Sequence, residues 1–372
     1  MRKRTQTLIS GLDILFNSLT TFIAFVYINL NLGYDITGYY GLVLSVSAFA
    51  ETIQMGLYEK PAYLGYKNGL NGKSLNFYHL IIVCIMPLLF IDRFILSGFL
   101  IMSLIFCLSY LGIQNIRVFD YVNKNIKTSF TRSLIIFLIV IFALAYLIFQ
   151  SLEINLNQVF AIIALPRALF IFVNRKKLFS IKNDKDADNL SMLISSTLTM
   201  VRSRLPLWAL LPFGLGLVGI YESFRNILEI YLTPSRPVFI IMMNNLKTEG
   251  PKKILQFGIV FCFLTVLFVA TSFFFLTNTA LFDIDEINNF STFIIMLIIV
   301  TCFWLSETTG MVFEFNSYFS FEAIRRFSSI LIYGILSLLL IEYLNFQYFL
   351  FLIAFMYFTE ALISFVYRKR LI

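Results

Sequence analysis

Residues 133–150 read SLIIFLIVIFALAYLIFQ, an apolar run without one charged side chain. A helix needs about 20 such residues to cross the hydrocarbon core of a bilayer, so this run needs only a few flanking residues to span it. Similar runs recur along the chain, and they lack the strict alternation of apolar and polar residues expected of outer-membrane strands. The sequence therefore predicts an all-α integral membrane protein.

The composition of the whole chain agrees with this prediction. Of the 372 residues, 59% are hydrophobic and 13% are charged, and the mean hydropathy is +0.83. Soluble domains carry about 25% charged residues. We find no Walker motif, glycine-rich phosphate loop or metal-ligand spacing, so neither a cofactor nor a metal is expected. The cysteines lie inside apolar runs without a CxxC pair, and we expect them to be buried thiols. They are Cys84, Cys107, Cys262 and Cys302.

We predict twelve transmembrane spans. Their approximate bounds are 8–32, 37–57, 76–91, 94–113, 133–150, 157–173, 191–213, 218–241, 255–277, 292–313, 327–341 and 345–367. The two termini and the even-numbered connections hold 23 of the 29 Lys and Arg residues, whereas the odd connections hold only Arg93. Cytoplasmic loops carry such an excess of basic residues, so both termini are predicted to face the cytoplasm. This distribution also explains the net charge of +8 without nucleic-acid binding.

The chain is predicted to divide into two six-span lobes, 1–180 and 191–372, joined by a cytoplasmic linker at 181–190. The most polar stretch, KNDKDADN, lies in that linker. LGYDITGYYG (32–41) follows span one and FGLGLVGIYE (213–222) follows span seven. In these segments Gly33, Gly38 and Tyr40 match Gly214, Gly219 and Tyr221. Such a match six spans apart indicates a parallel repeat about an axis along the membrane normal. Tight-turn glycines that arose twice are the alternative.

Two longer stretches resemble a known family. NLGYDITGYYGLVLSVSAFAETIQMGLYEKPAYL (31–64) resembles the first turn and second span of bacterial polysaccharide exporters, and FGLGLVGIYESFRNILEIYLTPSRPVFIIM (213–242) resembles their eighth span. These are the Wzx-type O-antigen and capsule repeat-unit flippases of the multidrug/oligosaccharidyl-lipid/polysaccharide (MOP) exporter superfamily. The chain is shorter than is usual for that family. It also has Arg202 and Arg204 in place of the aspartate often seen in span seven.

The resemblance implies that the chain is a flippase rather than an enzyme. It would translocate undecaprenyl-diphosphate-linked oligosaccharide repeat units across the bacterial cytoplasmic (inner) membrane. A polysaccharide polymerase and glycosyltransferases are candidate partners. Two alternatives stay open at this point. One is a cation or drug antiporter of the same superfamily, and the other is an integral-membrane glycan polymerase or ligase.

Arginines within the predicted spans are the candidate diphosphate ligands. An ionisable group inside a membrane is costly unless it is paired or wetted, so each is a site candidate. The forked guanidinium binds two phosphate oxygens at once. The candidates are Arg202, Arg204, Arg225 and Arg167. Structural alternatives are an ion pair of Arg202 with Glu222 or Glu51, snorkelling of Arg167, and an intrahelical cluster of Arg225 with Glu222 and Glu229.

Carboxylates within the spans are candidates for coupling transport to an ion gradient, because burial favours their protonated form. The candidates are Asp13, Glu51, Glu222, Glu307 and Glu360. The sequence does not rank them. Two six-helix lobes that rock about a central cationic cleft would give alternating access to the two sides of the membrane.

Overall fold

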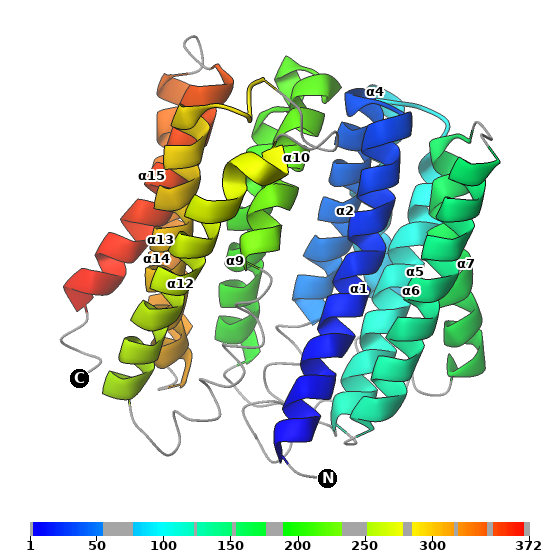
Figure 1. Cartoon of the computed structure of the whole chain (residues 1–372), viewed down its shortest axis with the longest axis horizontal. Helices are drawn as coiled ribbons and strands as arrows, with labels where there is room; N and C mark the ends of the chain where they lie inside the picture. The colour runs from blue at the N-terminus through cyan, green and yellow to red at the C-terminus, as the bar shows by residue number, and fades with distance from the viewer. Residues whose placement is uncertain are drawn as a thin grey trace. The chain divides into compact units, whose positions relative to one another are not determined.

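The computed structural model describes residues 3–54, 77–122, 125–150, 154–175, 189–232, 251–277, 285–315, 319–340 and 345–367. These residues form twelve α-helices and one 3₁₀ turn, and they contain no β-strand (Figure 1). The helices are α1 (Lys3–Asn31), α2 (Tyr34–Gln54), α4 (Phe77–Phe94), α5 (Leu100–Val122), α6 (Ile126–Phe149), α7 (Leu156–Val173), α9 (Asn189–Ala209), α10 (Leu215–Leu232), α12 (Pro251–Thr277), α13 (Phe290–Phe315), α14 (Phe319–Leu339) and α15 (Phe346–Val366). The 3₁₀ turn η2 is Leu211–Phe213.

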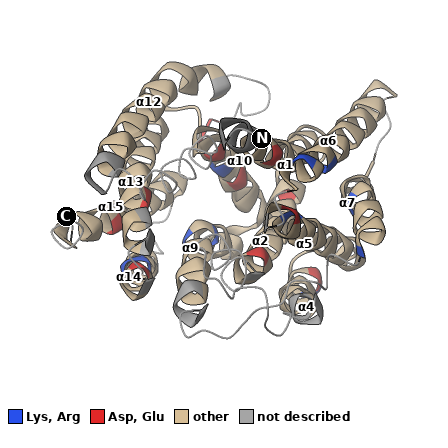
Figure 2. Cartoon of the chain, turned by 90° about the horizontal axis from the view of Figure 1, so that it is seen from below, with Lys and Arg blue, Asp and Glu red and all other residues tan. Residues whose placement is uncertain are grey.

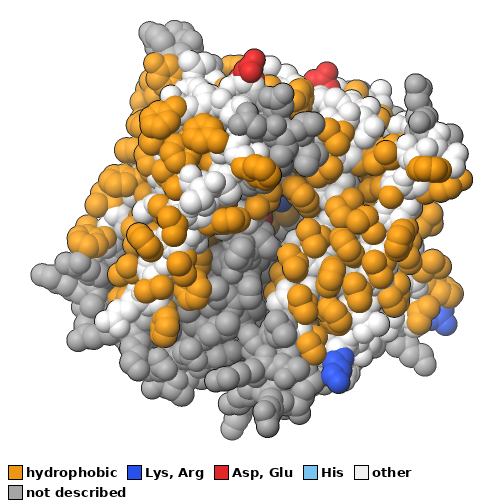
Figure 3. All heavy atoms as spheres, viewed as in Figure 1, with side chains coloured by type: hydrophobic (Ala, Val, Ile, Leu, Met, Phe, Trp, Pro, Cys, Tyr) orange, Lys and Arg blue, Asp and Glu red, His pale blue; other side chains and the backbone are white. Residues whose placement is uncertain are grey.

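The prediction of an all-helical chain with twelve helices is confirmed for the described residues. Seven of the helices are long and apolar enough to cross a membrane, and they are α1, α5, α6, α7, α12, α13 and α15. Large apolar side chains also lie on the surface, for example Phe142 (69% exposed), Phe275 (76%) and Leu338 (72%). On the face shown in Figure 3 the described side chains are mostly hydrophobic. Such a surface suits contact with lipid, so we treat the chain as a multi-pass membrane protein.

Three helices extend beyond the spans predicted from hydropathy. Helix α5 continues to Val122 although the span was predicted to end at 113, α6 begins at Ile126 rather than 133, and α14 begins at Phe319 rather than 327. Each extension carries charged residues that the sequence assigned to connections. Hydropathy detects only the apolar part of a helix, whereas a helix can continue through polar residues whose charges are neutralised.

The contacts divide the chain into two compact units. Unit 1 comprises Met1–Met200 and Leu207–Gly219, and unit 2 comprises Val201–Pro206 and Ile220–Ile372. In unit 1, α5 packs against α7, α2 and α4, while α1 packs against α6 (Figure 1). The predicted lobes and the cytoplasmic position of the termini stay predictions. The linker prediction falls largely on residues 181–188, which lie outside the described residues.

In unit 2, α13 lies at the centre of the helix packing. It packs against α15, α12 and α14, and α14 also packs against α15. Aromatic rings fill several of these interfaces. Phe261 of α12 stacks on the buried Trp304 of α13 with a centroid separation of 6.0 Å. Tyr221 of α10 meets Phe349 of α15 edge to face at 5.4 Å.

The two turn segments that the sequence matched have the same local conformation. Gly33 precedes α2 with φ +84°, and Gly214 precedes α10 with φ +108°. Only glycine adopts such angles readily, because it has no Cβ. In each segment the glycine carbonyl then accepts from the backbone N–H four residues on, Thr37 (3.0 Å) and Val218 (3.3 Å). The matched glycines therefore play one structural role twice.

The second matched glycine pair forms a reciprocal close contact within unit 1. A Cβ on Gly38 would lie 2.4 Å from the carbonyl oxygen of Leu215, the first residue of α10. A Cβ on Gly219 would lie 2.0 Å from the carbonyl oxygen of Tyr34, the first residue of α2. Each helix thus places its fifth residue against the first residue of the other, as two related copies would about a local two-fold axis. The parallel repeat of whole lobes stays a prediction.

Candidate functional site

Charged residues occupy only small parts of the described helices (Figure 2). In unit 1, Arg167 on α7 is fully buried. Its guanidinium carbon lies 5.7 Å from the ring centroid of Phe106 and 5.4 Å from that of Tyr110, both on α5. Its three side-chain nitrogens have no hydrogen-bond partner among the described residues. It makes cation–π contacts with the two rings, and the nearby carboxylate of Glu51 attracts it as well.

Glu51 of α2 belongs to the same site. The Tyr110 hydroxyl donates to Glu51 Oε2 at 2.8 Å, so one tyrosine contacts the carboxylate with its hydroxyl and the arginine with its ring. The structure thus brings together two residues that the sequence proposed separately, Arg167 as a diphosphate ligand and Glu51 as a coupling group. We call Glu51, Phe106, Tyr110 and Arg167 the Arg167 site.

Asp13 of α1 lies in a different part of unit 1 and is fully buried. Its Oδ2 accepts from Arg117 Nε (3.0 Å), the Tyr121 hydroxyl (2.5 Å) and Ser129 Oγ (3.0 Å). Its Oδ1 accepts from Ser133 Oγ at 2.5 Å. These donors come from α5 and α6, so Asp13 ties three helices together. Four donors hold the Asp13 carboxylate firmly.

A second buried pair joins α5 to α6. Arg132 Nη1 donates to Asp120 Oδ2 at 2.9 Å, and Nη2 donates to Ser129 Oγ at 3.2 Å. The sequence assigned Arg117 and Arg132 to a connection and gave them no site role. Asp120 was the available signal, because it is an acidic residue among the basic residues of that segment. An acid among basic residues indicates ion pairs, and such pairs allow the helix to continue past its apolar part.

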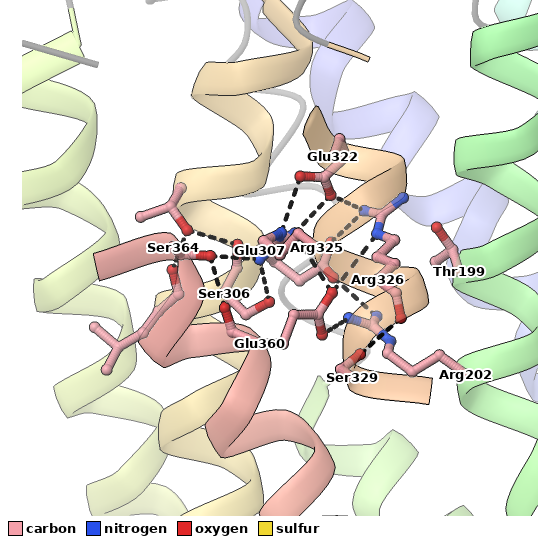
Figure 4. Close-up of polar contacts among 12 residues, drawn as sticks. Thr199, Arg202, Ser306, Glu307, Glu322, Arg325, Arg326, Ser329, Glu360 and Ser364 are labelled. Atoms are coloured by element: carbon pink, nitrogen blue, oxygen red, sulfur yellow. Dashed lines mark hydrogen bonds and ion pairs between the residues drawn. The ribbon is translucent and has the colours of Figure 1, made fainter. Parts of the chain in front are cut away.

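In unit 2, Arg202 lies on α9 and is 3% exposed. Its Nη2 donates to Glu307 Oε1 on α13 at 2.8 Å, and its Nη1 donates to Glu360 Oε2 on α15 (Figure 4). Its guanidinium also lies 5.0 Å from the ring centroid of Tyr357. The structural alternative for Arg202 named Glu222 or Glu51 as partners, but the partners are Glu307 and Glu360.

Helix α14 contributes the rest of this ion-pair network. Glu322 accepts from Arg325 at 2.5 and 3.0 Å and pairs with Arg326 at 2.6 Å. Arg325 Nη2 lies 3.5 Å from Glu360 Oε1, and Arg326 Nη2 lies 3.8 Å from Glu307 Oε2. The remaining donor of Arg325, Nη1, reaches Ser306 Oγ (2.6 Å), the Ser306 carbonyl and Ser364 Oγ (2.8 Å).

The network in unit 2 is balanced in charge. It contains three carboxylates and three guanidinium groups, and each guanidinium contacts at least one carboxylate. The sequence missed Glu322, Arg325 and Arg326 as members because it placed both arginines in a connection. Their spacing of three and four residues from the glutamate on one helix was the available signal.

The charged residues of α10 form a cluster within the helix. Arg225 donates to Glu222 at 2.5 and 2.8 Å and to Glu229 at 2.9 Å. The intrahelical alternative thus describes the geometry in this conformation. Arg204 is half-buried and lies two residues after Arg202. It therefore points about 200° away around α9.

No group of three or more His, Cys, Asp or Glu side chains could hold a metal ion within the described part of the chain. Cys84, Cys107, Cys262 and Cys302 are all buried and none forms a disulfide.

Comparison with known proteins gives a likeness in fold. No protein-family model matches the chain. No curated protein sequence matches it. Among solved structures, a MOP superfamily transporter from Pyrococcus furiosus superposes over 98% of this chain and 94% of its own, with a TM-score of 0.56 and 10% sequence identity. That protein is described as having a binding pocket of reverse polarity, which suggests a different function for it. The present chain has the fold of a MOP superfamily transporter.

Proposed function

We propose that the chain is a secondary transporter that flips undecaprenyl-diphosphate-linked oligosaccharide units across the bacterial cytoplasmic membrane by alternating access. The fold supports transport as the general activity, because it is the fold of a MOP superfamily transporter. On the same ground we propose a transporter rather than an enzyme. The substrate class rests on the turn motifs of the sequence and on the chemistry of Arg167.

The observation that carries the substrate class is the burial of Arg167 without a hydrogen-bond partner among the described residues. A buried charge is strongly destabilising unless something compensates it, and two aromatic rings compensate only part of it. A diphosphate would supply the missing acceptors, because its oxygens match the guanidinium fork. In this conformation Arg202 and Arg225 are occupied by carboxylates, so Arg167 becomes the first candidate ligand. Arg204 keeps its proposed supporting role.

Ion coupling is proposed for Glu51 on similar grounds. Asp13, Glu222, Glu307 and Glu360 each lie in an ion pair with an arginine. Glu51 instead accepts from a neutral hydroxyl, that of Tyr110. Among the described residues no salt bridge joins Glu51 to an arginine, so Glu51 is the first candidate for the coupling group. Because Tyr110 contacts both Glu51 and Arg167, protonation of Glu51 would change the electrostatic potential at Arg167, the residue proposed to bind the diphosphate.

The test is complementation of a host from which the gene has been deleted. Extracted prenyl-diphosphate lipids are identified by mass spectrometry and assigned to the inner or outer leaflet. The original chain should clear complete repeat units from the inner leaflet and restore surface glycan. Arg167→Gln should fail and Arg167→Lys should restore part of the activity. Arg175→Gln changes an exposed arginine just after α7 and is the matched control, which should behave as the original chain.

Stability separates a binding role from a structural one. If Arg167 serves substrate binding, Arg167→Met should keep or raise the thermal stability of the purified protein, because it removes a buried charge that has no hydrogen-bond acceptor among the described residues. The proposal is wrong if complete units reach the outer leaflet in the deletion strain, which would indicate a glycan polymerase or ligase. Loss of cation or drug export with normal lipid flipping would instead indicate an antiporter.

A further inference from the structure

A pocket of about 320 Å³ opens between α6 and α7 in unit 1, and no residue of the Arg167 site lines it. Its α6 wall includes Lys127, Thr131 and Ile135, and its α7 wall includes Phe170 and Asn174, the residue after the helix. Residues four apart lie on one face of a helix. The α6 residues therefore form one stripe, and Phe170 and Asn174 form a second stripe that faces it.

Both stripes change from polar to apolar in the same direction. On α6 the order is an ammonium, a hydroxyl and a branched alkyl chain, spread over about 12 Å of helix axis. On α7 the amide of Asn174 lies beside the polar end of the pocket, and the ring of Phe170 lies one turn further in. The residues Lys127, Thr131 and Ile135 are exposed, so the pocket is open to the surroundings of the helices.

Arg132 adds a buried cation to the polar end of the pocket. It is 3% exposed and lines the pocket, while Nη1 and Nη2 donate to Asp120 and Ser129. Its Nε is buried and has no hydrogen-bond partner among the described residues. The described lining of the pocket therefore holds two cations, Lys127 and Arg132, and no acidic residue, while Asp120 pairs with Arg132. An anion of single charge would balance this set.

We propose that this pocket binds one anionic glycerophospholipid. Its phosphate would lie between Lys127 and Arg132, its glycerol esters would lie against Thr131 and Asn174, and an acyl chain would pack on Ile135 and Phe170. Basic pockets between transmembrane helices on the cytoplasmic side bind anionic head groups in this way. The basic residues at this end of α6 predict that it faces the cytoplasm. The proposal does not depend on the transported substrate.

The test is native mass spectrometry of the full chain with phosphatidylglycerol and with phosphatidylcholine. The original chain should retain one phosphatidylglycerol in preference to phosphatidylcholine. Lys127→Gln should weaken this binding about fivefold, the usual contribution of one basic side chain near an anionic lipid. Ile135→Trp should abolish it by filling the apolar end. Arg93→Gln, which removes an exposed cation at the end of α4, is the matched control and should leave binding unchanged.

Two competitors distinguish the sources of the phosphate. Glycerol 3-phosphate, which has the head group without acyl chains, should not displace the lipid. If it does, the pocket is a site for free phosphate and the proposal is wrong. Farnesyl diphosphate should bind more weakly than phosphatidylglycerol. If farnesyl diphosphate instead binds more tightly, and Lys127→Gln abolishes its binding, the pocket is a site for a prenyl diphosphate. Unchanged binding in both Lys127→Gln and Ile135→Trp also refutes the proposal, provided that both variants remain monodisperse.

Discussion

Alanine at Gly219 should destabilise the protein because it would strike the backbone of α2. The new Cβ would lie 2.0 Å from the carbonyl oxygen of Tyr34. An ordinary C···O contact is no shorter than about 3.3 Å, so the helix ends must separate by roughly 1.3 Å. The contacted atom belongs to the backbone and cannot rotate away. Overpacking of this kind costs about 1–3 kcal/mol, against a gain of up to about 1 kcal/mol from replacing a helical glycine.

Because the approach at Gly219 is so close, we place its cost at the upper end of that range, which leaves a net loss of about 2 kcal/mol for Gly219→Ala. The loss is smaller for Gly38→Ala, whose Cβ would lie 2.4 Å from the Leu215 oxygen. Gly334 offers a matched control, because it is also helical but has no atom within 4 Å of a built Cβ. Gly334→Ala should be neutral or stabilising by up to about 1 kcal/mol. Thermal unfolding of the detergent-purified variants, followed by size-exclusion chromatography, measures the order of stability.

The expected order is Gly219→Ala least stable, then Gly38→Ala, then the original chain, with Gly334→Ala equal to it or higher. A Gly219→Ala variant as stable as the original chain would refute the reasoning. That result would mean that the first turns of α2 and α10 do not meet closely in the folded protein.

Three further predictions follow from buried charges and from one turn. Glu360→Gln removes one carboxylate from the balanced network and should destabilise unit 2 by about 3–5 kcal/mol. The assay is the loss of monodisperse protein on heating, and Glu286→Gln, on an exposed turn, is the control that should have no effect. Asp13→Asn leaves Arg117 without its acid and should lower thermal stability, and an Asp13→Asn/Arg117→Met double variant should recover part of the loss in a double-mutant cycle. In Gly214→Ala, the alanine would have to adopt φ near +108° and ψ near 155°, which its Cβ disfavours. The variant should lose about 1–3 kcal/mol of stability in the same thermal assay, and an unchanged melting temperature would contradict the turn geometry.

The sequence predicted the helices well because each has a long apolar segment. It also found the paired glycines at 33 and 214 and at 38 and 219, which the structure shows in matching conformations and in reciprocal contact. Those signals are local, because a turn angle or a close approach at a helix end requires a particular residue type. The intrahelical cluster around Arg225 was also within reach, since its partners lie three and four residues away.

The partners of Arg202 could not be predicted from the sequence. Glu307 and Glu360 lie 105 and 158 residues away, on helices whose apolar residues surround the axis. A helix that is apolar all round does not reveal which face packs against a neighbour. The sequence therefore listed all three residues as candidates but could not join them. It missed Arg325 and Arg326 for a different reason, because a buried ion pair allowed α14 to begin before its apolar segment.

The ion-pair network of unit 2 also constrains how the chain enters the membrane during synthesis. Within the α13–α14 hairpin, the network members are already matched, with Glu307 and Glu322 against Arg325 and Arg326. Helix α14 is not among the helices apolar enough to cross alone, so we expect it to leave the translocon together with α13. Arg202 is made much earlier than Glu360 of α15. Arg202 can pair with Glu307 once α13 has been made, but its second partner, Glu360, comes only with α15. A nascent protein truncated before α15 would therefore present an incompletely matched arginine to membrane quality control.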